Sequence, residues 1–239
     1  MQPTKADNRI EEEHLLNFVV NSLNEELPID LADGVKVTTE ELYEVLAGAS
    51  ASGTSVNHIC ETTEDSPHAN TVRGHLTDQF DLDTVEQVGD TLLQQDTIDT
   101  LPDRPVEVVA DLHLDPYYGD EDETEALYSS LAKRGTTTFH AYATLYARVR
   151  NKRYTLAVRQ LVAGETSSDV LREFLELLDG LDLRVKAVYL DRGFYNSTCL
   201  GLLYAYNYAY VIPVVKWGET IQDELSSGWS RVIEHELAG

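Results

Sequence analysis

Two apolar runs that each end at an aspartate constrain this chain more than any other feature. Residues 106–110, Val-Glu-Val-Val-Ala, lead into Asp111, and residues 185–190, Val-Lys-Ala-Val-Tyr-Leu, lead into Asp191. Short runs rich in β-branched and apolar residues predict strands. Two neighbouring strands that end at carboxylates bring them together at one edge of a sheet. The pattern therefore predicts an α/β fold with a pair of acidic side chains near its centre.

The order of the elements after residue 104 predicts how those two strands meet. We expect three strands, a helix, a strand, a helix and a strand, at about residues 106–112, 137–148, 154–162, 168–180, 185–190, 198–206 and 208–215. This is the order of the ribonuclease H-like fold, a mixed sheet whose first and fourth strands are central neighbours. The last run is nearly all apolar, which is typical of a buried strand. Residues 125–133 are interpreted as a short helix.

The first part of the chain, residues 1–104, is predicted to be an all-helical domain that precedes the ribonuclease H-like domain of residues 105–239. Two short helices, over residues 55–62 and 67–80, resemble a helix-turn-helix. Arg73 lies on the expected outer face of the second helix, where it is a candidate DNA contact. A small helical bundle with a polar solvent face explains the same pattern.

Cap residues place the ends of these helices. Thr38 with Glu41 forms a capping box at the start of one helix, and Gly48 is the expected end of that helix. Ser66 and Pro67 are the expected cap and first residue of a later one.

The charge of the chain bears on its partners. Its 18 Lys+Arg and 42 Asp+Glu give a net charge of −24, and phosphate repels such a chain in dilute salt. The acids are spread along the chain and Lys is scarcer than Arg, a composition typical of proteins that work in molar salt. There the Debye length is about 3 Å, so net charge says little about partners. An ordinary acidic cytosolic protein is the alternative interpretation.

The location is expected to be cytoplasmic, with no membrane partner. No apolar run approaches the ~20 residues of a membrane span, and the polar start of the chain is not typical of a secretory signal. Cys60 and Cys199 lie far apart, which indicates ordinary thiols and neither a disulfide nor a zinc site.

The two aspartates suit phosphodiester chemistry. Cleavage and transfer of a phosphodiester need an activated hydroxyl and a stabilised leaving oxygen, and divalent ions serve both. Mg²⁺ prefers oxygen ligands, so Asp111 and Asp191 are the predicted metal ligands and catalytic residues, with Mg²⁺ or Mn²⁺ as cofactor. A turn or cap role is the alternative for Asp111. Asp115 is a weaker candidate, because Pro116 suggests that the strand has ended.

Basic residues concentrate around the turn between the second and third predicted strands. A hairpin with these residues fits a DNA backbone, and a solvated hairpin tip is the alternative. Arg192, directly after Asp191, is a second candidate for contact with a phosphate; a surface ion pair is its alternative. The candidates on the turn are Arg148, Arg150, Lys152 and Arg153.

Three stretches carry a resemblance to a known family. Residues 110–113, 117–120 and 189–195 look like the DDE transposases of haloarchaeal insertion sequences, in the group with a Tyr-Arg-Glu-Lys signature around its third carboxylate. The resemblance implies metal-dependent DNA cleavage and strand transfer at the ends of an insertion sequence. It also implies double-stranded DNA partners, namely terminal inverted repeats bound with help from the helical region, and target DNA. It allows a homodimer on DNA.

The chain departs from that family at the third acid, which lies in a Tyr-x2-Arg-x3-Glu pattern. Tyr189 and Arg192 have the first spacing, but Asn196 stands at the Glu position. The expectation is an N-terminal fragment of a transposase that lacks the third carboxylate and is inactive by itself. The alternative is a non-catalytic DNA-binding protein that acts as a repressor at element ends. A non-transposase nuclease of the same fold is a third interpretation.

Overall fold

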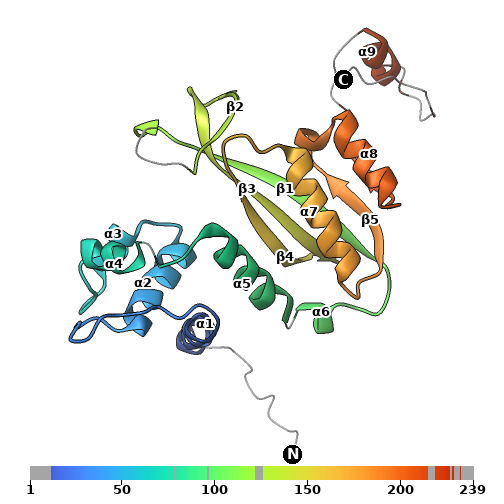
Figure 1. Ribbon diagram of the computed structural model, residues 1–239. Helices are drawn as coiled ribbons and strands as arrows, with labels where there is room; N and C mark the ends of the chain where they lie inside the picture. The colour runs from blue at the N-terminus through green and yellow to red at the C-terminus, as the bar shows by residue number, and fades with distance from the viewer. Residues whose placement is uncertain are drawn as a thin grey trace, which may run out of the picture. The chain divides into compact units, whose positions relative to one another are not determined.

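The computed structural model describes residues 12–77, 79–95, 97–121, 126–214, 219–226, 228 and 232. The chain divides into two compact units, Met1–Val88 and Gly89–Gly239. Figure 1 colours the chain from blue at its start to red at its end. The sequence pattern predicts the boundary between the units at the linker before Val106. In the structure, residues 89–104 instead belong to the same unit as the sheet. Two hydrogen bonds explain this grouping: Arg159 Nη2 contacts Asp90 Oδ2 at 2.6 Å, and Gln94 donates to the Leu156 carbonyl at 2.9 Å.

The first unit is helical in its described residues. Its core contains Val20, Leu42 and Val72, which are buried because apolar residues recur on one side of each helix. Tyr43 is also buried, donates its hydroxyl to the Leu27 carbonyl, and has a pKa raised to about 12 by that burial. The helices are α1 (Glu12–Glu26), α2 (Thr39–Ser52), α3 (Val56–Thr62), α4 (Ala69–Leu76) and the start of α5 (Leu82–Gln95).

Cap residues set two of these helix ends. The capping box of Thr38 and Glu41 is confirmed at the start of α2. The helix continues past Gly48 and ends at Gly53, whose left-handed conformation (φ 59°) lets its N–H reach the last carbonyls. The predicted start of α4 at Ser66 is wrong, because the His68 imidazole accepts the Asn70 N–H at 3.2 Å and caps the helix instead.

The second unit is a curled, mixed α/β sheet with helices (Figure 1). Its strands are β1 (Val106–Pro116), β2 (Tyr128–Lys133), β3 (Thr136–Val149), β4 (Lys152–Leu161), β5 (Val185–Leu190) and β6 (Tyr210–Val211). Its helices are α6 (Thr97–Thr100), α7 (Ser167–Gly180), the 3-10 turn η2 (Arg192–Phe194), α8 (Ser197–Ala205) and α9 (Glu219–Ser226). Among the helices of the described ranges, none is long and apolar enough to cross a membrane.

β1 lies at the centre of the sheet. It is antiparallel to β3, with Glu107 opposite Arg148 and Pro116 opposite Phe139, and parallel to β5, which in turn is parallel to β6. β2 and β4 share the other edge of β3, and both are antiparallel to it. The order is therefore β4-β3-β1-β5-β6, with β2 continuing the edge formed by β4. The strand that ends at Leu190 is a direct neighbour of β1, as the sequence predicted.

The short helix predicted for residues 125–133 is wrong in its described part. Tyr128–Lys133 is a strand that forms a hairpin with β3. Arg134 and Gly135 connect the two strands with φ of 53° and 88°. Positive φ at both central residues is the mark of a type I′ turn, which favours a two-residue hairpin. Pairing with β3 therefore outweighs the local helical preference.

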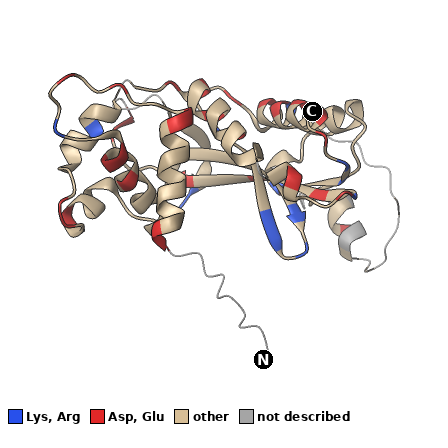
Figure 2. Ribbon diagram, turned by 90° about the horizontal axis from the view of Figure 1, so that it is seen from below, with Lys and Arg blue, Asp and Glu red and all other residues tan. Residues whose placement is uncertain are grey.

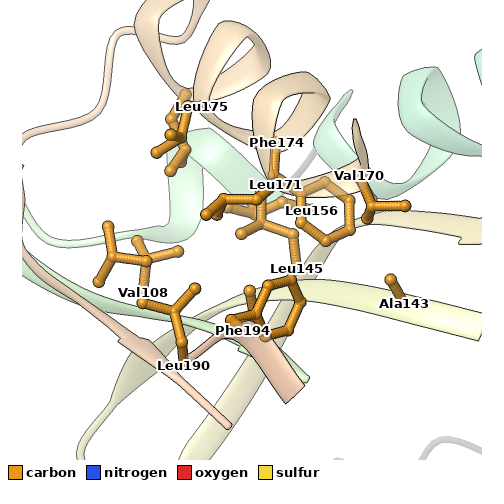
Figure 3. Packing of buried hydrophobic residues seen from close by; sticks show 14 of the residues in the cluster. Val108, Ala143, Leu145, Leu156, Val170, Leu171, Phe174, Leu175, Leu190 and Phe194 are labelled. Atoms are coloured by element: carbon orange, nitrogen blue, oxygen red, sulfur yellow. The ribbon is translucent and has the colours of Figure 1, made fainter. Parts of the chain in front are cut away.

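One face of the sheet packs against α7 and α8. Val106, Val108 and Ala110 of β1 are buried on this face, and they alternate with residues that point to the opposite face. Figure 3 shows Leu171 and Phe174 of α7 among the side chains of the sheet. The alternation places Glu107, Val109 and Asp111 on the face away from α7.

The final predicted strand is much shorter than expected. The apolar run of residues 208–215 was expected to be a buried strand, but β6 pairs only at Tyr210 and Val211, and residue 215 lies outside the described residues. These side chains are 42% and 50% exposed, because β6 is at the edge of the sheet.

Candidate functional site

The two predicted aspartates lie side by side at the centre of the sheet. Ala110 of β1 pairs with Leu190 of β5 in the parallel ladder, so Asp111 and Asp191 are the next residues of two adjacent strands. Neighbouring strands are about 4.8 Å apart. The negative charge of Asp111 contributes to raising the pKa of Asp191, as expected for two carboxylates this close.

Asp191 is held in a fixed position by the turn that follows it. Its Oδ1 accepts the Gly193 N–H at 2.7 Å, which makes Asp191 the cap of η2. Burial is the main reason that its pKa lies above the ordinary value, and the hydrogen bond from Gly193 opposes this effect. Asp111 raises the pKa further, while the positive charge of Lys133 and the Phe194 N–H lower it. The net effect is a carboxylate whose charge is only partly compensated.

The turn at Gly193 leaves little space for a side chain. A Cβ at Gly193 would lie 3.0 Å from Asp191 Oδ1 and 3.6 Å from Leu112 Cδ2. A larger residue would therefore press on the carboxylate that the turn presents. This close approach explains the glycine two residues after Asp191.

Asp111 is exposed and stands opposite Thr144 of β3. β1 continues beyond it, because the ladder with β3 extends to Pro116, so the expected end of the strand before Pro116 is wrong. Asp115 shares the face of Asp111 but is four residues away, which corresponds to roughly 13 Å along a strand. Asp115 is therefore too far from Asp111 to share an ion with it.

Asn196, at the Glu position of the spacing that Tyr189 and Arg192 begin, is a structural residue. Its Oδ1 accepts the Cys199 N–H at 2.9 Å and caps α8, and its Nδ2 lies 3.2 Å from Cys199 Sγ. Within the described ranges, no group of three or more His, Cys, Asp or Glu side chains has the arrangement of a metal site. The donor set on the sheet is thus the pair Asp111 and Asp191. Mg²⁺ is commonly held by one or two carboxylates plus substrate phosphates, so the pair fits this ion or Mn²⁺.

The predicted basic residues fall into three places. Arg192 is exposed in η2, next to the carboxylate pair. The four basic residues of the β3–β4 turn lie at the opposite end of β1, where Arg148 pairs with Glu107. Arg73 belongs to the helical unit, is exposed on α4, and donates to Asn70 Oδ1 at 3.4 Å. Six residues separate α3 from α4, more than the three or four of a typical helix-turn-helix.

One basic residue near the pair was missed. Lys133, at the end of β2, lies close enough to Asp191 to lower its pKa. The signal for it in the sequence is weak: Arg134-Gly135 before the β-rich run of β3 has the glycine that a two-residue hairpin turn favours, but residues 128–133 do not have a strand pattern of their own.

No protein-family model matches this chain, and no curated protein matches it. The function is therefore inferred from the residues of the site and from the order of the strands.

Proposed function

We propose that this chain is a transposase-type protein with a ribonuclease H-like domain, which acts on double-stranded DNA through Mg²⁺ or Mn²⁺ held by Asp111 and Asp191. The observation that carries this proposal is that Asp111 and Asp191 directly follow Ala110 and Leu190, which pair in the parallel ladder of β1 and β5. The order β4-β3-β1-β5-β6, with β3 antiparallel to β1, supports a ribonuclease H-like fold. Terminal inverted repeats, target DNA and a homodimer on DNA belong to the same proposal.

The residues of the site have separate tasks in this proposal. A divalent ion bound there would activate an attacking hydroxyl and stabilise the leaving oxygen of a phosphodiester. The Gly193 N–H orients the Asp191 carboxylate, and the ladder with β3 holds Asp111 beside it. Lys133 supplies a positive charge near the pair, in a position suited to a DNA phosphate.

We expect the chain by itself to be inactive in DNA cleavage, because the described site contains two carboxylates and Asn196 is engaged as a helix cap. The same observation favours a second candidate function, a non-catalytic DNA-binding protein that represses transposition at element ends. The exposed Arg73 on α4 is its candidate DNA contact.

A titration with Mn²⁺, followed by the loss of the electron paramagnetic resonance signal of the free ion, tests the metal site. The titration is made in 1 M KCl, so that the net charge of −24 does not attract the ion nonspecifically. We expect one specific site in the wild-type chain, lost in Asp111→Asn and in Asp191→Asn. The matched control is Asp115→Asn, which removes the same charge from the same strand and should bind as the wild type does. Equal Mn²⁺ binding by all four proteins would exclude the proposed site.

A plasmid-nicking assay with Mg²⁺ separates the two candidate functions. Nicking that requires the metal and is abolished by Asp191→Asn would show that the two carboxylates suffice for catalysis. DNA binding without nicking, weakened by Arg73→Ala and independent of metal, would support the repressor.

A further inference from the structure

The end of the sheet opposite the carboxylate pair gathers positive charge from three segments of the chain. The linker before β1, the β3–β4 turn and the start of β5 meet there. Figure 2 shows Lys and Arg gathered on a hairpin of the sheet, while Asp and Glu are spread over other parts of the chain. We call this surface the basic rim; it consists of Arg104, Arg148, Arg150, Lys152, Arg153 and Lys186.

The basic rim is hollowed. Two hollows of about 280 Å³ and one of about 600 Å³ adjoin around Arg150, which lines all three of them. Arg150 occupies the left-handed conformation of the turn, with φ of 57°. Among the described residues that line these hollows, Glu107 is the one acid. The hollows therefore have a local excess of positive charge on a chain that is acidic as a whole.

Glu107 organises part of the basic rim. Its carboxylate contacts Lys186 Nζ at 3.1 Å and Arg148 Nη2 at 3.5 Å. The hydrogen bond from Lys186 is the main reason that the pKa of Glu107 lies below its ordinary value, and the charge of Arg148 adds to this effect. Arg153 is placed over the Tyr146 ring, with 5.1 Å from Cζ to the ring centroid. These contacts orient three cationic side chains of the basic rim.

We propose that the basic rim binds the phosphate backbone of double-stranded DNA that continues from the carboxylate pair along β1. This inference rests on the proposed function for the choice of DNA. Glu107 and Asp111 are four residues apart on one face of β1, or roughly 13 Å. Phosphates of one B-DNA strand repeat about every 3.4 Å along the helix axis. If the reacting phosphate lies at Asp111 and Asp191, the basic rim would therefore contact phosphates about four nucleotides from it along the duplex.

The shape of the surface favours an extended polyanion. The positive side chains come from residues as distant in sequence as Arg104 and Lys186, and they surround several adjoining hollows rather than one enclosed pocket. A row of phosphates satisfies such an arrangement, whereas a single small anion would contact only a few of these side chains.

Fluorescence anisotropy of a labelled 20-bp duplex, in EDTA and at several KCl concentrations, tests the basic rim. The variant Arg150→Gln/Lys152→Gln removes two of its charges and leaves the contacts of Glu107 in place. Two lost phosphate contacts should reduce the salt slope by about 1.8, which corresponds to about 60-fold weaker binding at 0.1 M salt. The matched control is Lys36→Gln/Arg172→Gln, which changes the net charge equally at two exposed positions outside the basic rim.

The outcomes distinguish this inference from the proposed function. Weaker binding and a smaller slope in the rim variant alone, with wild-type behaviour in the control, would support the basic rim. Equal affinity and slope in rim variant and wild type, or the same loss in the control, would overturn it. Equal displacement of the duplex by poly-glutamate at the same charge concentration would overturn the choice of DNA. The metal site is tested separately, because Mn²⁺ binding is measured without DNA and the rim variant should leave it unchanged.

Discussion

Replacing Asp191 by asparagine should stabilise the fold in buffer without divalent ions. Asparagine keeps a side-chain oxygen that accepts the Gly193 N–H, and it removes a charge that burial and Asp111 both disfavour. Asp111 and Asp191 follow the paired residues Ala110 and Leu190 on neighbouring strands, which are about 5 Å apart. Because Asp111 is exposed, we use an effective dielectric constant between roughly 40 and 80. The repulsion between the two carboxylate charges is then about 1 kcal/mol. This corresponds to a rise in Tm of about 2–4 °C for a unit of this size.

The stability gain of Asp191→Asn should depend on pH in a definite direction. The pKa of Asp191 is raised in the folded chain, so the folded chain binds this proton more tightly than the unfolded chain does. The charged Asp191 destabilises the wild type fully at a pH above the pKa that Asp191 has in the folded chain. This destabilisation decreases as the pH falls through that pKa, and it is absent below the lower pKa that Asp191 has in the unfolded chain. The stability gain of Asp191→Asn should therefore be largest near neutral pH and vanish in acid.

Thermal unfolding followed by circular dichroism, in EDTA at a series of pH values, measures both effects. The control is Asp115→Asn, which removes the same formal charge roughly 13 Å from Asp111. If Asp191→Asn lowered Tm at neutral pH, or changed it no more than Asp115→Asn does, the reasoning from repulsion would be refuted. Mg²⁺ should reverse the ranking, because a ligand at ten times its Kd stabilises the wild type by about 1.4 kcal/mol and has no such site in Asp191→Asn.

Two further predictions concern the core and the turn. Phe174→Ala removes a fully buried ring of α7 and should cost about 3–5 kcal/mol in urea unfolding, whereas Val158→Ala, at a side chain that is 39% exposed, should cost less than about 1 kcal/mol. A similar loss in both variants would contradict the assigned core. Gly193→Ala places a methyl group 3.0 Å from Asp191 Oδ1, so the Mn²⁺ titration should show at least tenfold weaker binding with the circular dichroism spectrum unchanged. Unchanged Mn²⁺ affinity would contradict the need for a glycine there.

The centre of the sheet was predictable because its signals are local. The alternation of Val106, Val108 and Ala110 with more polar residues predicts a strand with one buried face, and Asp111 follows in the same strand. The apolar run that ends at Asp191 gives the same information for β5. Their neighbouring positions then follow from the order of strands and helices.

The hairpin of β2 and β3 was not predicted, because pairing decides its structure. Residues 128–133 have no strong alternation, and a helix is a reasonable local alternative. The type I′ turn at Arg134-Gly135 and the ladder with β3 select the strand. As a consequence, the sequence did not predict that Lys133 lies near Asp191.

The exposure of β6 and the composition of the basic rim depend on distant parts of the chain. The apolar run of residues 208–215 predicts burial, but burial requires a covering element that no property of the run itself reveals. In the same way, Arg104 and Lys186 reach one surface only because β1 and β5 pair with each other. The four basic residues of the β3–β4 turn were visible in the sequence because they are adjacent.

The acids of the central strands differ in how far the fold compensates their negative charge, and this difference supports the proposed metal site. Glu107 and Asp111 lie on the same face of β1, in a chain with 42 acidic residues, so acidity alone does not distinguish them. Glu107 is paired with Lys186 and Arg148, and its pKa is lowered. Asp191 is half-buried beside Asp111, and its pKa is raised despite the hydrogen bond from Gly193. A carboxylate that the fold orients firmly but leaves undercompensated gains most from an external cation, which is why the metal is proposed at Asp111 and Asp191 and the DNA backbone at the opposite end of β1.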